Sequence, residues 1–124
     1  MTITYDDIVK AQKTQSDVIR KTNLEFSETF SKICGANVYL KNEYEQKTGS
    51  FKIRGAYYKI KSLTEEEKSK GVVAASAGNH SQGVAFASMI ENIPCTIVMP
   101  KTASPAKVAA TKGYGANVVL EGLT

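Results

Sequence analysis

One lysine of this chain, Lys52, lies where its amine could act as a nucleophile. It follows a glycine-serine turn, Gly49-Ser50, and precedes a run of residues with helical spacing. Ser50 is a favourable helix N-cap, which predicts Lys52 in the first helical turn. The positive end of the helix dipole disfavours an ammonium ion there, and partial burial adds to that effect. We therefore expect an amine that loses its proton readily and can attack an electrophile.

The neighbours of Lys52 suit the binding of a flat ring. Gly55 lies one helical turn later on the same face, where it leaves space, and Phe51 offers an aromatic ring next door. These are the parts of a site in which a lysine carries pyridoxal phosphate (PLP) covalently. The Ser-x-Lys spacing is common, however, and by itself it favours an ordinary surface lysine in the first turn of a helix.

A second stretch, Ser76–Gly83, joins an apolar run to a helical segment. The run Val72–Ala75 precedes it and Val84–Ala87 follows it. A glycine-containing turn between a strand and a helix presents backbone N–H groups and the positive end of the helix. This arrangement predicts a seat for an anion such as a carboxylate.

The two stretches Ser50–Ala56 and Ser76–Val84, in this order, resemble the fold-type II PLP enzymes. Within that class the sequence is most similar to the threonine dehydratase and serine dehydratase group, with serine racemase beside it. The similarity extends from about Thr22 to the C-terminus, and two motifs in order are more specific than one glycine pattern. The resemblance implies an α/β fold of the tryptophan-synthase-β-like type, with a parallel sheet and flanking helices.

The resemblance also implies how the chain is divided. Residues 1–50 would be the N-terminal part of the large PLP domain, and residues 51–124 most of the small α/β domain. The related enzymes are much longer, and they hold the PLP phosphate with a glycine-rich loop that lies beyond the matching end of this chain. Because no such loop occurs in the 124 residues, we expect a truncated form from which the remainder of the family fold is absent.

The resemblance assigns roles to residues of both motifs. Lys52 would carry PLP and, once substrate has displaced it, remove the Cα proton. Asn79 would donate a hydrogen bond to the 3′-oxygen of PLP, and Phe51 would pack against the cofactor. The substrate carboxylate would be received by donors of the second motif. These donors are Ser76, Gly78 and His80.

Several of these assignments have structural alternatives. Asn79 is also a good helix N-cap, and Phe51 could equally belong to the core. His80 as a proton donor is a weaker interpretation than a hydrogen-bonded structural histidine. Arg54 is expected to form a structural ion pair.

Ala77 bears on the choice between two activities. Serine racemase has a second catalytic serine at the matching position, on the opposite face of the cofactor. An alanine methyl group cannot transfer a proton, so Ala77 argues against racemisation and for elimination from one side.

The implied activity is the PLP-dependent deamination of L-threonine to 2-oxobutanoate and ammonia, and of L-serine to pyruvate. Both threonine catabolism and isoleucine biosynthesis are compatible roles. Serine racemase or another fold-type II PLP enzyme is one alternative, and a free-standing, non-catalytic α/β interaction domain is another. The resemblance also implies a homo-oligomer.

The composition argues against several other classes of protein. The net charge of +4 comes from basic residues interleaved with acids, without the basic run of a nucleic-acid arm. Cys34 and Cys95 stand far apart and outside any C-x-x-C pattern, which predicts free thiols and no metal site. His80 is the single histidine. The N-terminus has no apolar segment, which predicts a cytoplasmic protein without a signal peptide or membrane span.

Periodicity predicts alternating helices and strands. The expected helices begin near Thr4, Ser27, Phe51, Thr64, His80 and Ser104, and the expected strands are 37–41, 72–75, 95–99 and 117–120. The last three strands are apolar runs, which predicts a parallel sheet buried on both faces and built from βαβ units. Small residues at positions 83, 85, 87 and 88 would let their helix pack closely on that sheet. The final strand is expected to expose Val118, Val119 or Leu120 and to promote self-association.

Overall fold

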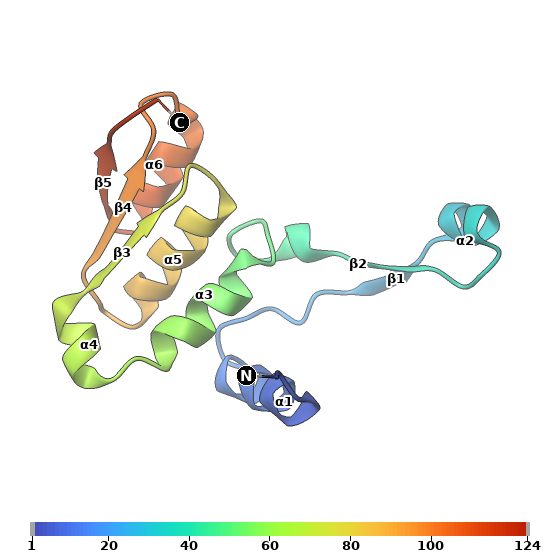
Figure 1. The fold of residues 1–124 in the computed structure, drawn as a ribbon. Helices are drawn as coiled ribbons and strands as arrows, with labels where there is room; N and C mark the ends of the chain where they lie inside the picture. Colours follow the sequence, from blue (N-terminus) through green and yellow to red (C-terminus); the bar gives the residue numbers. More distant parts are fainter. Residues whose placement is uncertain (1, 124) are drawn as a thin grey trace.

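The computed structural model describes residues 2–123, which alternate between helices and strands (Figure 1). The elements are α1 (Tyr5–Thr14), β1 (Leu24–Phe26), α2 (Glu28–Cys34), β2 (Tyr39–Lys41), the short 3₁₀ helix η1 (Glu43–Glu45), α3 (Lys52–Lys61), α4 (Glu65–Lys70), β3 (Val72–Ala75), α5 (Asn79–Ile90), β4 (Cys95–Met99), α6 (Pro105–Gly113) and β5 (Asn117–Leu120). Every expected helix and strand is present, with small shifts at the ends. The elements β1 and η1 had not been expected from the sequence.

Three of the strands form a parallel sheet with β4 in the centre. The register pairs Val72 with Cys95 and Thr96 with Asn117. The helices α5 and α6 connect the strands in succession and lie on one side of the sheet (Figure 1). Successive right-handed crossovers in one direction place their helices on the same face. The expected α/β class with a parallel sheet and flanking helices is therefore confirmed.

The expectation that these strands are buried on both faces is wrong within residues 2–123. Ile97 and Met99 of β4 point toward the helices and are buried. Val73 of β3 and Val119 of β5 point the other way and are exposed. Both connecting helices lie on one face, so nothing in the described part of the chain covers the other.

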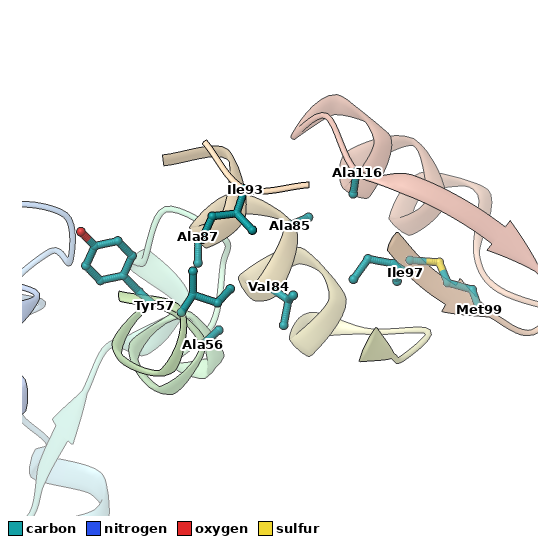
Figure 2. Packing of buried hydrophobic residues seen from close by; sticks show 10 residues of the cluster. Ala56, Tyr57, Val84, Ala85, Ala87, Ile93, Ile97, Met99 and Ala116 are labelled. Atoms are coloured by element: carbon teal, nitrogen blue, oxygen red, sulfur yellow. The ribbon is translucent and has the colours of Figure 1, made fainter. Parts of the chain in front are cut away.

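The helix α5 lies between the sheet and α3 (Figure 2). The two helices come close together at Gly83, where an added Cβ would come within 3.2–3.3 Å of backbone atoms of Lys52 and Ile53. Gly83 thus lets two helix backbones touch, and its predicted role in packing on the sheet is wrong. The α3 residues that pack inward are those with helical spacing. They are Ile53, Ala56, Tyr57 and Ile60.

A nearly buried carboxylate ties α3 to the end of α5. Glu91 accepts hydrogen bonds from Tyr57 Oη and Lys61 Nζ, both at 2.9 Å. Burial acts to raise the pKa of Glu91, but the hydrogen bonds from Lys61 and Tyr57 outweigh it and the pKa falls. Burial, together with Glu91, raises the pKa of the Tyr57 phenol. The carboxylate therefore stays charged and fastens the two helices near the end remote from Lys52.

Residues 23–45, which we name the arm, extend away from this unit (Figure 1). Within the arm, β1 pairs with β2 in antiparallel fashion, and α2 lies at the far end. Phe26 and Tyr39 pack edge to face across the two strands, with ring centroids 5.5 Å apart. The large apolar side chains of the arm are nevertheless exposed. They are Leu24, Phe26, Phe30, Ile33, Tyr39, Leu40 and Tyr44.

The ends of the helices follow local signals in the sequence. Thr4 and Thr64 begin α1 and α4 with complete capping boxes. Gly35 ends α2 in the left-handed conformation, with φ 65°. The last helical residue of α6 is Gly113, and Gly115 adopts the left-handed conformation with φ 82° two residues later.

Candidate active site

Lys52 is the first residue of α3, at the positive end of the helix as expected. The N-cap is Phe51 and not Ser50, so that expectation is wrong. Phe51 has a helical backbone conformation and makes no side-chain capping bond. The first residue of α3 is thus Lys52, one position later than an N-cap at Ser50 predicts. The Ser50 hydroxyl is buried and has no hydrogen-bond partner among residues 2–123.

The surroundings of Lys52 are open. Lys52 is exposed in the described chain, contrary to the expected partial burial. Its Nζ lies 5.2 Å from the centre of the Phe51 ring, which is itself 57% exposed and so does not belong to the core. A Cβ added at Gly55 would meet no atom within 4 Å. Lys52, Phe51 and Gly55 are therefore all accessible from outside in the described chain.

The second motif lies where β3 turns into α5. Gly78 occupies the N-cap position, so Asn79 is the first helical residue and the N-cap alternative for Asn79 is wrong. The Gly78 N–H donates to Ser76 Oγ at 3.2 Å. Asn79 and His80 are exposed, and Ser76 is half-buried. The first N–H groups of α5 have no acceptor inside the helix, which makes the loop a seat for an anion.

The contact at Gly83 brings the two motifs together. Gly83 lies four residues after Asn79, on the same face of α5. A Cβ added there would lie only 3.2–3.3 Å from backbone atoms of Lys52 and Ile53, so the two backbones are close neighbours at this point. The first turn of α3 and the start of α5 are therefore neighbours, although 26 residues separate Lys52 from Gly78 along the chain.

The residues around Lys52 fit a ring-shaped cofactor that bonds to an amine. The Lys52 amine is exposed next to the Phe51 ring, and Gly55 on the same helix has open space where a side chain would be. In the loop directly before α3, the hydroxyl oxygens of Thr48 and Ser50 are buried without a partner among residues 2–123. Buried hydroxyl groups normally have partners, so these two retain hydrogen-bonding capacity for a further group.

Arg54 forms the structural ion pair that was expected. Its Nε and Nη2 donate to the two carboxylate oxygens of Glu43 at 2.9 and 2.7 Å. Thr22 also donates to Glu43, at 2.7 Å. The hydrogen bonds from Arg54, with smaller help from Thr22, lower the pKa of Glu43 from 4.5 to about 2. This paired geometry attaches the base of the arm to α3, two residues after Lys52.

A hollow of about 640 Å³ lies elsewhere, beside α1. It is lined by Ile8, Gln15, Arg20, Lys41 and Arg54 among others, and Lys52 does not line it. The candidate site around Lys52 is an open surface in the described chain, whereas a ligand pocket normally encloses most of its ligand.

One charged residue near the second motif was not singled out from the sequence. Lys107, in the first turn of α6, points its amine toward Gly78. The sequence did contain a signal for Lys107. The helices α5 and α6 each follow a strand of the parallel sheet, so both begin at the same edge of the sheet. Ligands of open α/β sheets bind beyond those strand ends.

Comparisons with known proteins agree with this geometry. The family model described as pyridoxal-phosphate dependent enzyme matches residues 15–122. Over 120 residues the chain is 56% identical to the L-threonine ammonia-lyase of Thermotoga maritima, covering 97% of this chain and 30% of that protein. The structure of serine racemase from Dictyostelium discoideum has a TM-score of 0.93 and 44% identity, covering 100% of this chain and 40% of the other. The structure of the processed form of threonine deaminase isoform 2 from Solanum lycopersicum has a TM-score of 0.83 and 40% identity. The match covers 100% of this chain and 36% of the other.

The matched region includes both motifs, and the chain belongs to the family of PLP-dependent enzymes. Its fold is that of the fold-type II members, which confirms the class implied by the motifs. The chain spans about a third of the length of the relatives that it matches.

Two further features bear on the setting of the site. No helix within residues 2–123 is long and apolar enough to cross a membrane. In the same residues, no three His, Cys, Asp or Glu side chains are grouped to hold a metal ion. Cys34 is exposed and Cys95 is half-buried, and both are free thiols.

Proposed function

We propose that this chain supplies the cofactor lysine and the substrate-carboxylate loop of a PLP-dependent ammonia-lyase. The substrate is L-threonine, which gives 2-oxobutanoate and ammonia, and L-serine reacts in the same way to give pyruvate. The observation that carries the proposal is the contact of Gly83 with the backbone of Lys52 and Ile53, which places the two motifs side by side. The 56% identity to an L-threonine ammonia-lyase supports the choice of substrate.

The chain's own residues have distinct tasks in this reaction. Lys52 holds the cofactor and, once free, removes the proton from the substrate Cα as a general base. Asn79 and Phe51 orient the cofactor ring, the first by a hydrogen bond and the second by packing. The loop that includes Ser76, Gly78 and His80 receives the carboxylate. When bound, PLP supplies the electron sink that lets the Cα proton leave and the β-hydroxyl depart.

The wider assignment follows the family resemblance of the two motifs. Residues 1–50 are assigned to the N-terminal part of the large domain of the complete enzyme, and residues 51–124 to most of its small α/β domain. We expect that enzyme to be a cytoplasmic homo-oligomer. Threonine and serine differ by one methyl group, which a pocket discriminates only about 10- to 200-fold, so both should react.

Racemisation of serine is the second candidate, because a serine racemase structure superposes on the whole chain. Ala77 weighs against it. This residue lies between Ser76 and Gly78 in the carboxylate loop, and its methyl group has no proton to transfer to a substrate. Racemisation of L-serine at a rate comparable to pyruvate formation would reverse the order of the two candidates.

The proposal is tested by replacing the lysine in the complete enzyme. Lys52→Ala should lower 2-oxobutanoate formation from L-threonine by at least about 100-fold, because it removes the general base. Lys59→Ala is the matched control, since Lys59 is exposed on the same helix two turns away. Loss of activity in Lys52→Ala with retention in Lys59→Ala supports the assignment. Normal turnover by Lys52→Ala would end it.

A further inference from the structure

Lys107 of α6 lies beside the loop that we assign to the substrate carboxylate. A Cβ added at Gly78 would lie 3.7 Å from Lys107 Nζ and would meet no other atom within 4 Å apart from its chain neighbours. We propose that Lys107 binds the carboxylate of the amino-acid substrate together with the Ser76–His80 loop. Lys107 thereby selects substrates with a free carboxylate. This inference rests on the proposed function.

Two buried hydroxyl groups fix the backbone of Lys107 relative to the loop. Thr111 Oγ1 donates to the carbonyl oxygen of Lys107 at 2.8 Å and lies 3.5 Å from Ser81 Oγ. Ser81 in turn donates to the carbonyl oxygen of Gly78. Ser81 and Thr111 are completely buried. The start of α6 and the carboxylate loop are therefore held as one unit, and the lysine side chain extends from a defined place.

The positive charge of Lys107 is in an unfavourable place unless an anion binds. Lys107 lies in the first turn of its own helix α6 and also faces Gly78 at the start of α5, so the positive ends of two helices act on its ammonium group. It is half-buried, which raises the cost of leaving the charge unpaired.

The described chain offers this charge no partner. Among residues 2–123, every ion pair involves another basic residue, and no carboxylate oxygen lies within 4.0 Å of Lys107 Nζ. Gly78 lies five residues before Gly83, the residue whose contact joins this helix to Lys52. A carboxylate seated on the loop would neutralise the ammonium group and satisfy the free N–H groups of α5 at the same time.

The experiment compares three variants of the complete, PLP-loaded enzyme. Lys107→Met removes the charge and keeps most of the side-chain volume, Lys107→Arg keeps the charge, and Lys112→Met changes an exposed lysine of the same helix. Lys107→Met should raise the KM for L-threonine roughly 10- to 100-fold, as expected for the loss of one charge-assisted hydrogen bond, with kcat within about threefold. Lys107→Arg should keep the KM for L-threonine close to that of the parent enzyme. Lys112→Met should change neither KM nor kcat.

Two further measurements separate the possible sources of the anion. L-threoninamide lacks the carboxylate, so its KM should be the same in the parent enzyme and in Lys107→Met. If Lys107→Met instead weakens PLP binding and leaves the KM for L-threonine unchanged, the lysine binds the cofactor phosphate and the proposal is overturned. Equal KM values for L-threonine in Lys107→Met and Lys112→Met also overturn it.

A binding measurement keeps this test independent of the proposed reaction. Acetate, a carboxylate without an amino group, is titrated into the complete protein while the amide resonance of Gly78 is followed by NMR. The concentration dependence of the shift gives the affinity for acetate. An affinity that falls at least about tenfold in Lys107→Met supports the carboxylate site even if threonine is not the substrate. The two proposals can also fail separately. If the parent enzyme deaminates threonine and Lys52→Ala does not, the proposed function holds. If acetate nevertheless binds equally well to the parent and to Lys107→Met, the carboxylate inference alone fails.

Discussion

The unit formed by α3, α5, α6 and the β3–β5 sheet differs from the arm in where its apolar side chains lie. In the unit, Ile53, Ile97 and Met99 are at most 1% exposed. In the arm, Leu24 and Ile33 are 62% and 73% exposed. Both regions contain many apolar residues, so their composition does not explain the contrast. The difference lies in which surfaces the connectivity of each region can cover.

The contrast has a topological cause. In the unit, β3 and β4 are each followed by a helix that returns across the sheet, so the apolar face of the sheet is covered by the helices that connect its strands. The arm is one antiparallel pair with a short helix, and two strands alone cannot bury their apolar faces. The unit thus carries a core of its own, whereas the arm depends on contacts from outside residues 23–45. Large contiguous apolar patches are unusual on the surface of a monomer.

The largest difference in stability between the two regions should appear when one isoleucine in each is replaced by alanine. Ile97→Ala should lower the free energy of unfolding by about 2–5 kcal/mol, because it leaves a cavity between the sheet and α5. Ile33→Ala, the matched change in the arm, should alter it by no more than about 0.5 kcal/mol. Urea unfolding of the 124-residue chain followed by circular dichroism measures both. Equal losses would show that the arm is as well packed in solution as the unit.

An intermediate effect should come from the ion pair that joins the two regions. Glu43→Gln should cost roughly 1–3 kcal/mol, because Arg54 loses a doubly hydrogen-bonded carboxylate. The folded-state pKa of Glu43 lies below its usual value, so its contribution is complete above pH 4.5 and is lost as the pH falls toward 2. The gap between the parent and Glu43→Gln should therefore close over that window in acid unfolding curves.

The control for this pH dependence is Glu25→Gln, on the exposed strand β1. It should leave the acid unfolding curve within about 0.5 kcal/mol of the parent. A gap between the parent and Glu43→Gln that stays constant from pH 7 to pH 2 would mean that the ion pair does not supply the difference.

The smallest effect on stability should come from the open face of the sheet. Val119→Lys should change the free energy of unfolding by no more than about 0.5 kcal/mol, because Val119 is exposed on the edge strand β5. It should nevertheless reduce self-association of the 124-residue chain, since a charged lysine protects an exposed edge. Size-exclusion chromatography over a concentration series measures this.

The control is Asn117→Lys, which adds the same charge on the same face without removing an apolar side chain. If both variants reduce association equally, charge repulsion explains the result. If the parent chain remains monomeric at every concentration, the open face is not an association surface. Of the three residues expected to be exposed, Val119 and Leu120 are exposed, and Val118 is half-buried against the core.

Much of the local structure could be predicted because its causes are local. The capping boxes at Thr4 and Thr64 fix where two helices begin, and the spacing of inward residues on α3 matches the core. The order of apolar runs and helices predicts the parallel sheet. The family follows from two motifs, which is why Lys52 and the Ser76–His80 loop could be singled out before any geometry was known.

The sequence by itself determined all the helices and strands except β1 and the short η1, together with the family and the candidate lysine, since these depend on neighbours along the chain. The tertiary structure alone decided which surfaces meet. It showed that Gly83 contacts α3, that one face of the sheet is open, and that Lys52 is exposed. It also brought Lys107 to Gly78, 29 positions away in sequence. Such contacts depend on how separate helices cross in space, and no periodicity within one segment encodes the position of another.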